Sequence, residues 1–212
     1  MLAGAVNAIS VGYFSATTVS HVTGLISKVS IFITIGSWEF IWVSLRVILA
    51  FFLGALLTGF ITGERAFELK KRYGFIIISL GLLFIIPYFI PEDYAILLLA
   101  FIMGMQNGMI VSFKGIVVRM THMSGNVTDL AVFLGYRLRG NKNEDRKTGL
   151  IPFIAIISFL IGGVLGVLVY KEIGDVFFFI VSGLYVLVGI LYFITRSRCI
   201  DKNFNGIPDE LE

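Results

Sequence analysis

Residues 40–61, FIWVSLRVILAFFLGALLTGFI, form an apolar run that a single charge, Arg46, interrupts. About 20 consecutive apolar residues are needed for an α-helix to cross the hydrocarbon core of a bilayer. Further blocks of nearly this length carry no charge at all, at residues 74–90, 94–113, 149–170 and 176–195. Together these blocks predict an all-α, polytopic helical membrane protein.

The composition agrees with an apolar environment. Of the 212 residues, 57% are hydrophobic and only 15% are charged, whereas soluble domains carry about 25% charged residues. Residues 1–20, MLAGAVNAISVGYFSATTVS, contain no charge, so they lack the basic start of a signal peptide and are expected to form a retained helix. This helix would be the sixth full span.

Several classes of function are disfavoured. The single cysteine, Cys199, rules out an intrachain disulfide, and the chain has no CxxC motif for zinc. The net charge of +3 is modest and its basic residues cluster at the ends of apolar blocks, which predicts membrane orientation rather than nucleic-acid binding. No HExxH, phosphate-binding glycine loop or Ser-His-Asp order is present, so we expect no enzyme.

The loop charges predict the orientation, because cytoplasmic loops collect Lys and Arg. Basic residues concentrate in residues 63–74, in residues 137–147 and after residue 195, whereas the turns at 91–93 and 171–175 are acidic or balanced. The three basic segments are therefore assigned to the cytoplasm, together with both termini.

The chain also contains an internal repeat. Gly4-Ala5-Val6-Asn7 recurs as Gly104-Met105-Gln106-Asn107, and Ser20-His21-Val22-Thr23-Gly24 recurs as Thr121-His122-Met123-Ser124-Gly125. We divide the chain into a first repeat at 1–92, a second at 93–196 and a tail at 197–212. Each repeat holds three full spans and one short segment, and an odd number of crossings turns the second copy upside down. The expected architecture is a pair of inverted-topology repeats.

The short segments, near 25–35 and 126–136, are where we expect a site. In each, a hydroxyl residue and a glycine predict the N-cap of a helix that starts after a break. A re-entrant helix would point its free N–H groups into the protein, and the alternative is an amphipathic helix on the membrane surface. The candidate solute-binding residues are His21, Thr23, Gly24, His122, Ser124, Gly125 and Asn126, with Asn7 and Asn107 from the first span of each repeat.

We predict that His21, His122, Asn7 and Asn107 line one central cavity, although the two amides could instead only join helices. Lys28 and Asp129 stand four residues after the two glycines. They could form an ion pair between the repeats, or lie at the membrane surface.

Arg46 lies deeper in its span than an interfacial residue should. Its expected partner is Asp129 or Glu39, seven residues before it on the same helix face. With Lys28 and Asp129 it completes a set of candidate ion-pair or coupling residues.

The tail resembles the twelve-residue EF-hand calcium loop. The ligand positions would be Asp201, Asn203, Asn205, Ile207, Asp209 and Glu212, with Gly206 at the turn. Two of these positions carry Asn in place of Asp, so we expect weak Ca²⁺ binding at most, and an acidic disordered tail is the alternative.

The elements at 104–107 and 121–125, with Thr128-Asp129-Leu130 after them, resemble the YoaK-like family of uncharacterised bacterial multi-pass membrane proteins. The resemblance covers residues 1–196 and implies an inner-membrane permease without an established substrate. Two positions depart from it. Asn7 stands where an aspartate is usual and Leu25 where an asparagine is usual. If that aspartate relays protons in relatives, this chain is not expected to be coupled to protons.

Two functions follow as hypotheses. The first is a small transporter or channel for a polar or anionic small solute, with its site at the two helix breaks. The alternative is a non-transport membrane protein, such as a scaffold or a calcium-responsive partner of another complex. The expected partners are the lipid bilayer, the small solute and, as an open question, a second copy of the chain.

Overall fold

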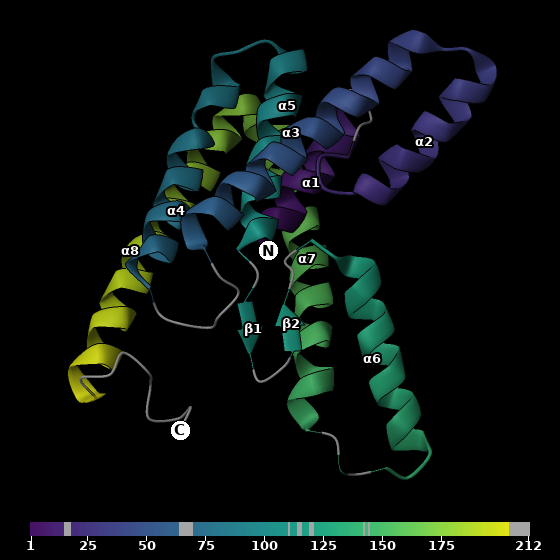
Figure 1. The fold of residues 1–212 in the computed structure, drawn as a ribbon. Helices are drawn as coiled ribbons and strands as arrows, with labels where there is room; N and C mark the ends of the chain where they lie inside the picture. Colours follow the sequence, from purple (N-terminus) through teal and green to yellow (C-terminus); the bar gives the residue numbers. More distant parts are fainter. Residues whose placement is uncertain are drawn as a thin grey trace.

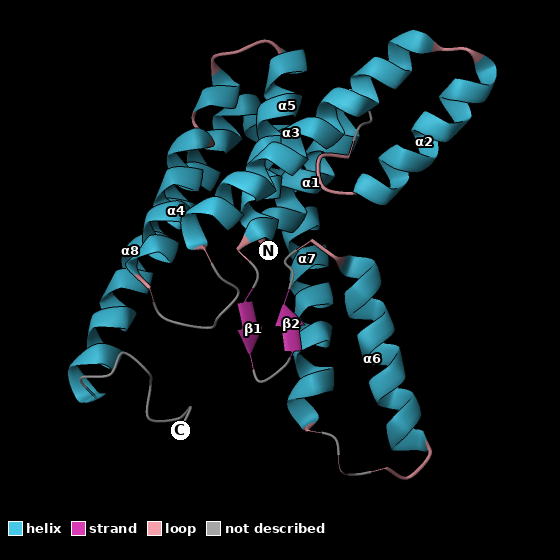
Figure 2. Cartoon of the chain, in the orientation of Figure 1, coloured by secondary structure: helices cyan, strands magenta, loops and turns pink. Residues whose placement is uncertain are grey.

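The computed structural model describes residues 1–14, 18–63, 70–109, 111–113, 116–118, 121–141, 143 and 145–203. For residues 111–113, 116–118 and 198–203 it describes the backbone alone. The described chain is helical apart from one short antiparallel hairpin, in which Val111 pairs with Val118 (Figures 1 and 2).

The elements in chain order are α1 (Leu2–Tyr13), α2 (Val22–Ile35), α3 (Trp38–Thr62), α4 (Lys71–Leu83), η1 (Ile86–Tyr88), α5 (Glu92–Gly108), β1 (Val111–Phe113), β2 (Ile116–Val118), α6 (Met123–Leu138), α7 (Arg146–Ile173), η2 (Gly174–Val176) and α8 (Phe177–Asn203). The hairpin was not predicted from the sequence.

Local chemistry explains several helix ends. α2 and α3 stop at Gly36 and Gly63, whose φ angles of 70° and 75° are left-handed and suit a residue without a Cβ. α7 begins after Asp145, whose carboxylate accepts a hydrogen bond from the Lys147 N–H. α5 begins after Pro91, which lacks the N–H that the first turn would leave unused.

Two expected spans are shorter than the sequence predicted. α1 ends at Tyr13 and not near residue 20, and α5 ends at Gly108, before β1 begins at Val111. At about 1.5 Å per residue, α1 is about 18 Å long, less than the thickness of a hydrocarbon core of about 30 Å. The apolar residues that follow each helix belong to the segments that lead to the short helices α2 and α6.

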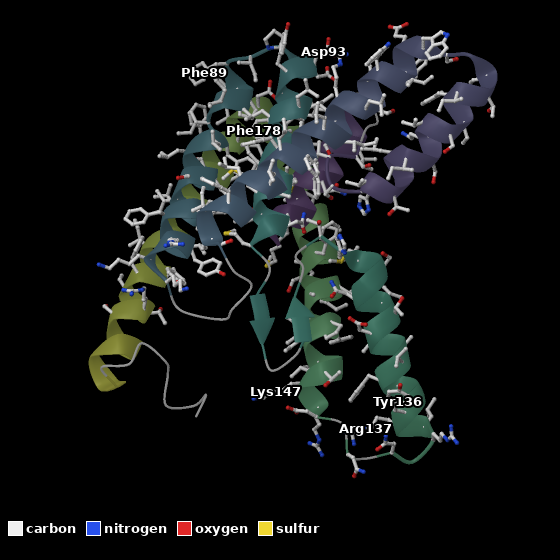
Figure 3. All side chains as sticks on the ribbon, in the orientation of Figure 1. Phe89, Asp93, Tyr136, Arg137, Lys147 and Phe178 are labelled. Atoms are coloured by element: carbon white, nitrogen blue, oxygen red, sulfur yellow. The ribbon has the colours of Figure 1, made fainter. Side chains whose placement is uncertain are left out.

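Close backbone contacts join the long helices. Gly104 of α5 faces the backbone of Phe51 in α3, and Gly4 of α1 faces the backbone of Phe159 in α7. α4 packs on α8 through Gly74, next to the rings of Tyr192 and Phe193. Small residues allow such approach in apolar surroundings. Phe178 of α8 is fully buried in the core that these pairs enclose (Figure 3).

The short helices pack on the outside of this core. α2 lies against α3, and α6 lies against α7. In Figure 1 the α2–α3 hairpin extends to the upper right and the α6–α7 hairpin to the lower right, so the two hairpins point toward opposite ends of the molecule. Among the described residues of each short helix one is buried, Leu25 in α2 and Asn126 in α6.

Three helical stretches among the described residues are long and apolar enough to cross a membrane: Trp38–Thr62, Lys71–Tyr88 and Arg146–Ser197. The last contains both α7 and α8, which meet at η2. Their outward faces are apolar; the exposed fraction of Phe60 is 85% and that of Leu160 is 61%. An apolar surface this extensive is unfavourable in water and marks contact with lipid. These features are those of a membrane protein.

Candidate functional site

The two helix breaks have matching geometry. α2 begins at Val22 and α6 at Met123, so the N-cap residues are the two histidines, His21 and His122. Their φ and ψ angles are −96° and 69° for His21 and −81° and 66° for His122, which is not helical. The prediction of a new helix at each break is confirmed.

The predicted cap residues, however, are two positions too late. Thr23 and Ser124 already lie in the first turn, where their carbonyls accept hydrogen bonds from the hydroxyls of Ser27 and Thr128. A hydroxyl can cap a helix only from a non-helical backbone position, and both residues follow the cap. Thr23, Gly24, Ser124 and Gly125 are all exposed.

A buried hydrogen bond between an amide and a hydroxyl side chain lies next to each break. The Ser20 hydroxyl donates to Asn7 Oδ1 at 2.8 Å, and the Thr121 hydroxyl donates to Asn107 Oδ1 at 2.9 Å. All four side chains are buried. The first bond joins Ser20, directly before His21, to α1. The second joins Thr121, directly before His122, to α5. The two amides therefore hold the breaks in position.

Each of these hydrogen-bond pairs is extended by local bonds. Asn107 Nδ2 donates to the Met103 carbonyl at 2.9 Å, and the Ser10 hydroxyl donates to the Asn7 carbonyl at 2.8 Å. Ser20 and Thr121 were not singled out from the sequence. The sequence contained a signal for these two residues, because a hydroxyl residue directly precedes each of the two histidines.

A second polar contact lies beside Asn107. Gln106 Oε1 accepts a hydrogen bond from the Tyr185 hydroxyl at 2.9 Å, which connects α5 to α8. The ring of Tyr185 stacks on Phe84 with centroids 5.0 Å apart. Tyr185 was not predicted, because its partner lies 79 residues away in the sequence.

The histidines differ in environment, since His21 is half-buried and His122 is exposed. In Figure 1 the starts of α2 and α6 both lie near mid-height of the molecule, and neither lies at its outer ends. A cavity shared by His21, His122, Asn7 and Asn107 stays a prediction.

Among the candidate site residues that the structure describes, Asn126 alone has a buried side-chain atom without a hydrogen-bond partner. Its exposed fraction is 7%, and its Nδ2 has no hydrogen-bond partner among the described residues. The equivalent position in the first repeat element is Leu25, which is 2% exposed and part of the hydrophobic core. The two breaks therefore share a backbone geometry but differ in the side chain that they bury.

The charged candidates lie on the surface. Lys28, Asp129 and Arg46 are exposed on α2, α6 and α3. Among the described residues, Arg46 forms no ion pair with Asp129 or Glu39. A coupling role for these charges stays a prediction.

The calcium-loop prediction falls mostly outside the described residues, because Asn205, Ile207, Asp209 and Glu212 lie there. α8 continues to Asn203, so the backbone of Asp201 and Asn203 is helical. Within the described residues, no group of three or more His, Cys, Asp or Glu side chains could hold a metal ion. Calcium binding by the tail stays a prediction.

Comparison with known proteins matches the chain to a protein family. No curated protein and no solved structure matches the chain. Residues 1–191 match a family described as "Protein of unknown function (DUF1275)". The match ends before the calcium-like tail and covers nearly the same residues as the resemblance seen in the sequence. With nine-tenths of its length matched, this chain belongs to the DUF1275 family of uncharacterised proteins.

Proposed function

We propose that this protein is a small integral membrane transporter or channel for a polar or anionic small solute. It consists of two inverted-topology repeats, residues 1–92 and 93–196, in the bacterial inner membrane with both termini cytoplasmic. The solute site lies at the two helix breaks, near the interface of the repeats.

The recurrence of each packing contact supports the repeat architecture. α1 packs on α7 as α5 packs on α3, and α2 packs on α3 as α6 packs on α7. When the first repeat is exchanged with the second, the α1–α7 pair becomes the α5–α3 pair, and the α2–α3 pair becomes the α6–α7 pair. α4 packs on α8, its own counterpart, as expected for elements beside a two-fold axis.

Individual residues support the same exchange. Gly104 and Gly4 are 100 positions apart, and the residues that they face, Phe51 and Phe159, are 108 positions apart. The contact between α5 and α3 is thus made by the same residue types as the contact between α1 and α7. Such inverted repeats with broken helices are the architecture of many secondary transporters.

The observation that carries the proposal is the pair of buried amide–hydroxyl hydrogen bonds, Ser20 to Asn7 and Thr121 to Asn107. Non-helical backbone within a membrane protein is tolerated only where protein buries it or it lines a cavity. Two equivalent, hydrogen-bonded breaks next to the chain's two histidines provide polar groups for a solute in an otherwise apolar molecule. Histidine can also change its charge near neutral pH.

Solute exchange by purified protein tests the proposal. The protein is reconstituted into liposomes loaded with a mixture of organic acids, sugars and amino acids, and its exchange with labelled external solutes is measured. We expect exchange of at least one solute, reduced in His21→Ala and His122→Ala. The matched control is Gly59→Ala, because no other side chain or helix lies within 4 Å of the position that a Cβ would take there.

Two results would count against the proposal. The first is an absence of exchange for every solute class by folded protein that also shows no solute-dependent thermal stabilisation. The second is solute exchange at the wild-type rate in both histidine variants, which would show that the site does not lie at the breaks.

A further inference from the structure

α4 and α8 lie side by side and run antiparallel (Figure 1). Gly81 of α4 lies against Val186 of α8. Two turns nearer the start of α4, Gly74 lies against the ring of Phe193. The register therefore moves by one residue on α8 for each residue on α4. Continued by one more turn, it places Arg196 next to residues 70 and 71, where α4 begins.

A hydrogen bond joins the two helices at this end. The Tyr192 hydroxyl donates to the Lys70 carbonyl at 2.8 Å, and the charge of Arg196 lies within electrostatic range of the same hydroxyl. Arg196 follows Tyr192 by four residues, so the two side chains share one face of α8. Lys70 and Arg196 therefore lie close together, one from each side of the helix pair.

Both cations lie at the end of a membrane-spanning stretch. The stretch that contains α4 begins at Lys71, and the stretch that contains α8 ends at Ser197. Lys70 comes directly before the first boundary and Arg196 directly before the second. Tyrosine is enriched at this depth of a membrane, where Tyr192 bonds to the chain. Long basic side chains at helix ends extend to the membrane surface, so both cations reach the phosphate layer of one leaflet.

Positive charge predominates at this end of the helix pair. Residues 63–72 contain four basic and two acidic residues, and residues 196–203 contain three basic and one acidic residue. The opposite end of α4 and α8 has the reverse balance, with Lys171 near four exposed acidic residues, Glu92, Asp93, Glu172 and Asp175. The charge at the basic end therefore favours a ligand with a net negative charge.

An apolar surface lies one turn deeper in the membrane. Phe75 of α4 and Phe193 of α8 form an edge-to-face pair with ring centroids 5.2 Å apart. Phe193 precedes Arg196 by three residues and so lies on the same face of α8. The exposed fraction of Phe75 is 61%, which leaves this ring open to lipid. A charged surface with an exposed aromatic pair beneath it matches the two parts of a phospholipid.

Net charge decides which phospholipid fits best. A zwitterionic headgroup carries its own cation next to the phosphate, and Lys70 and Arg196 would repel that cation. An anionic headgroup has no such cation and is attracted by both residues. The planar guanidinium of Arg196 can also bind two phosphate oxygens at once.

We propose that the basic end of α4 and α8 binds an anionic phospholipid, with its phosphate between Lys70 and Arg196 and an acyl chain along Phe75 and Phe193. Basic surfaces between transmembrane helices recognise anionic headgroups in this way. The site is separate from the two helix breaks, so the inference does not depend on which solute the protein carries.

Thermal unfolding of the full-length protein in a neutral detergent, titrated with short-chain phosphatidylglycerol, tests this assignment. Short-chain phosphatidylcholine is the zwitterionic comparison, glycerol phosphate supplies the anionic group without acyl chains, and sodium chloride matches the ionic strength. We expect phosphatidylglycerol to raise the melting temperature in a saturable way and the other three solutes to leave it unchanged.

The variants Lys70→Gln and Arg196→Gln each remove one cation. Each should weaken the apparent affinity for phosphatidylglycerol by about fivefold, as expected for one cation near an anionic surface. Lys70→Gln keeps the backbone carbonyl to which Tyr192 donates. The matched control is Arg139→Gln, which removes an exposed cation directly after α6 and should keep the wild-type affinity.

Four outcomes overturn the assignment. The first is stabilisation by phosphatidylcholine equal to that by phosphatidylglycerol. The second is equal stabilisation by glycerol phosphate, which would indicate a site for free phosphates. The third is an affinity for phosphatidylglycerol in Arg196→Gln and Lys70→Gln that is no lower than in Arg139→Gln.

The fourth outcome concerns residues 204–212, which include three acidic residues. If their removal lowers the melting temperature and phosphatidylglycerol stabilises neither the full chain nor the shortened one, the basic end binds this segment in place of a lipid.

Discussion

Gly104 of α5 lies so close to the backbone carbonyl of Phe51 in α3 that a methyl group at residue 104 would overlap it. A backbone atom cannot move aside as the end of a side chain can. The two helices therefore depend on the absence of a side chain at this position. The same relationship between Gly4 and Phe159 joins α1 to α7.

Replacing this glycine should separate the two helices. Gly104→Ala is expected to destabilise the protein by about 1–3 kcal/mol, the usual range for overpacking a close contact. Gly59→Ala is the control, because it faces open space on α3 and should be neutral or gain up to about 1 kcal/mol from helix propensity. Unfolding in detergent micelles measures both. Equal stability of the two variants would mean that the crossing tolerates a side chain.

A buried hydroxyl strengthens the same crossing. Thr58 is fully buried on α3, and its hydroxyl donates to the Met105 carbonyl of α5 at 3.0 Å. Thr58→Val keeps the shape and removes the donor, so it should cost about 0.5–1.5 kcal/mol, toward the lower end as in other membrane helix pairs.

Thr195→Val provides the comparison for this hydroxyl. Thr195 lies on the exposed side of α8, and its hydroxyl donates to the Leu191 carbonyl of its own helix at 2.9 Å. Its replacement should change the unfolding free energy little, because no contact between helices is lost. If both threonine variants were equally stable, the bond between Thr58 and Met105 would contribute nothing measurable.

Arg72 caps the end of the preceding long helix. Its Nη1 donates to the carbonyls of Ile61 and Thr62 at 3.1 and 3.3 Å, in the last turn of α3. A positive charge there interacts favourably with the helix dipole, by about 0.3–1 kcal/mol at low ionic strength. Arg72→Gln should lose this stabilisation, and added salt should reduce the difference from wild type.

Lys71→Gln is the matched control for the cap, since Lys71 is an exposed neighbour with the same charge. A loss of stability as large in Lys71→Gln as in Arg72→Gln would assign the effect to net charge and not to the two hydrogen bonds. Thermal scans at low and high salt separate these explanations.

The inverted topology can be tested by labelling. Asp93, in the first turn of α5, and Asn143, between α6 and α7, are both exposed and lie at opposite ends of the molecule. Asp93 is at the top of Figure 3, and the end of α6 with Tyr136 and Arg137 is at the bottom. In a Cys199→Ser background, Asp93→Cys should react with a membrane-impermeant thiol reagent in intact cells. Asn143→Cys should react only after permeabilisation. Labelling with the opposite sidedness would refute the orientation assigned from the loop charges.

Several features of the fold and site could be predicted from the sequence. The apolar blocks predicted the long helices α3, α4, α7 and α8, because the length of an apolar run is a local property of the chain. The repeat of Thr23-Gly24 as Ser124-Gly125 located both helix breaks. The departure of Leu25 from the family pattern was also visible in the sequence.

By itself, then, the sequence determined the apolar character of this protein and the position of its two breaks, since composition and repetition need no knowledge of distant residues. The tertiary structure alone decided where α1 and α5 end and that Ser20 and Thr121 bond to Asn7 and Asn107. It also decided that Asn126 Nδ2 is buried with no hydrogen-bond partner among the described residues. Burial and hydrogen bonding depend on which atoms other segments bring nearby, and α7, which covers α6, lies further along the chain.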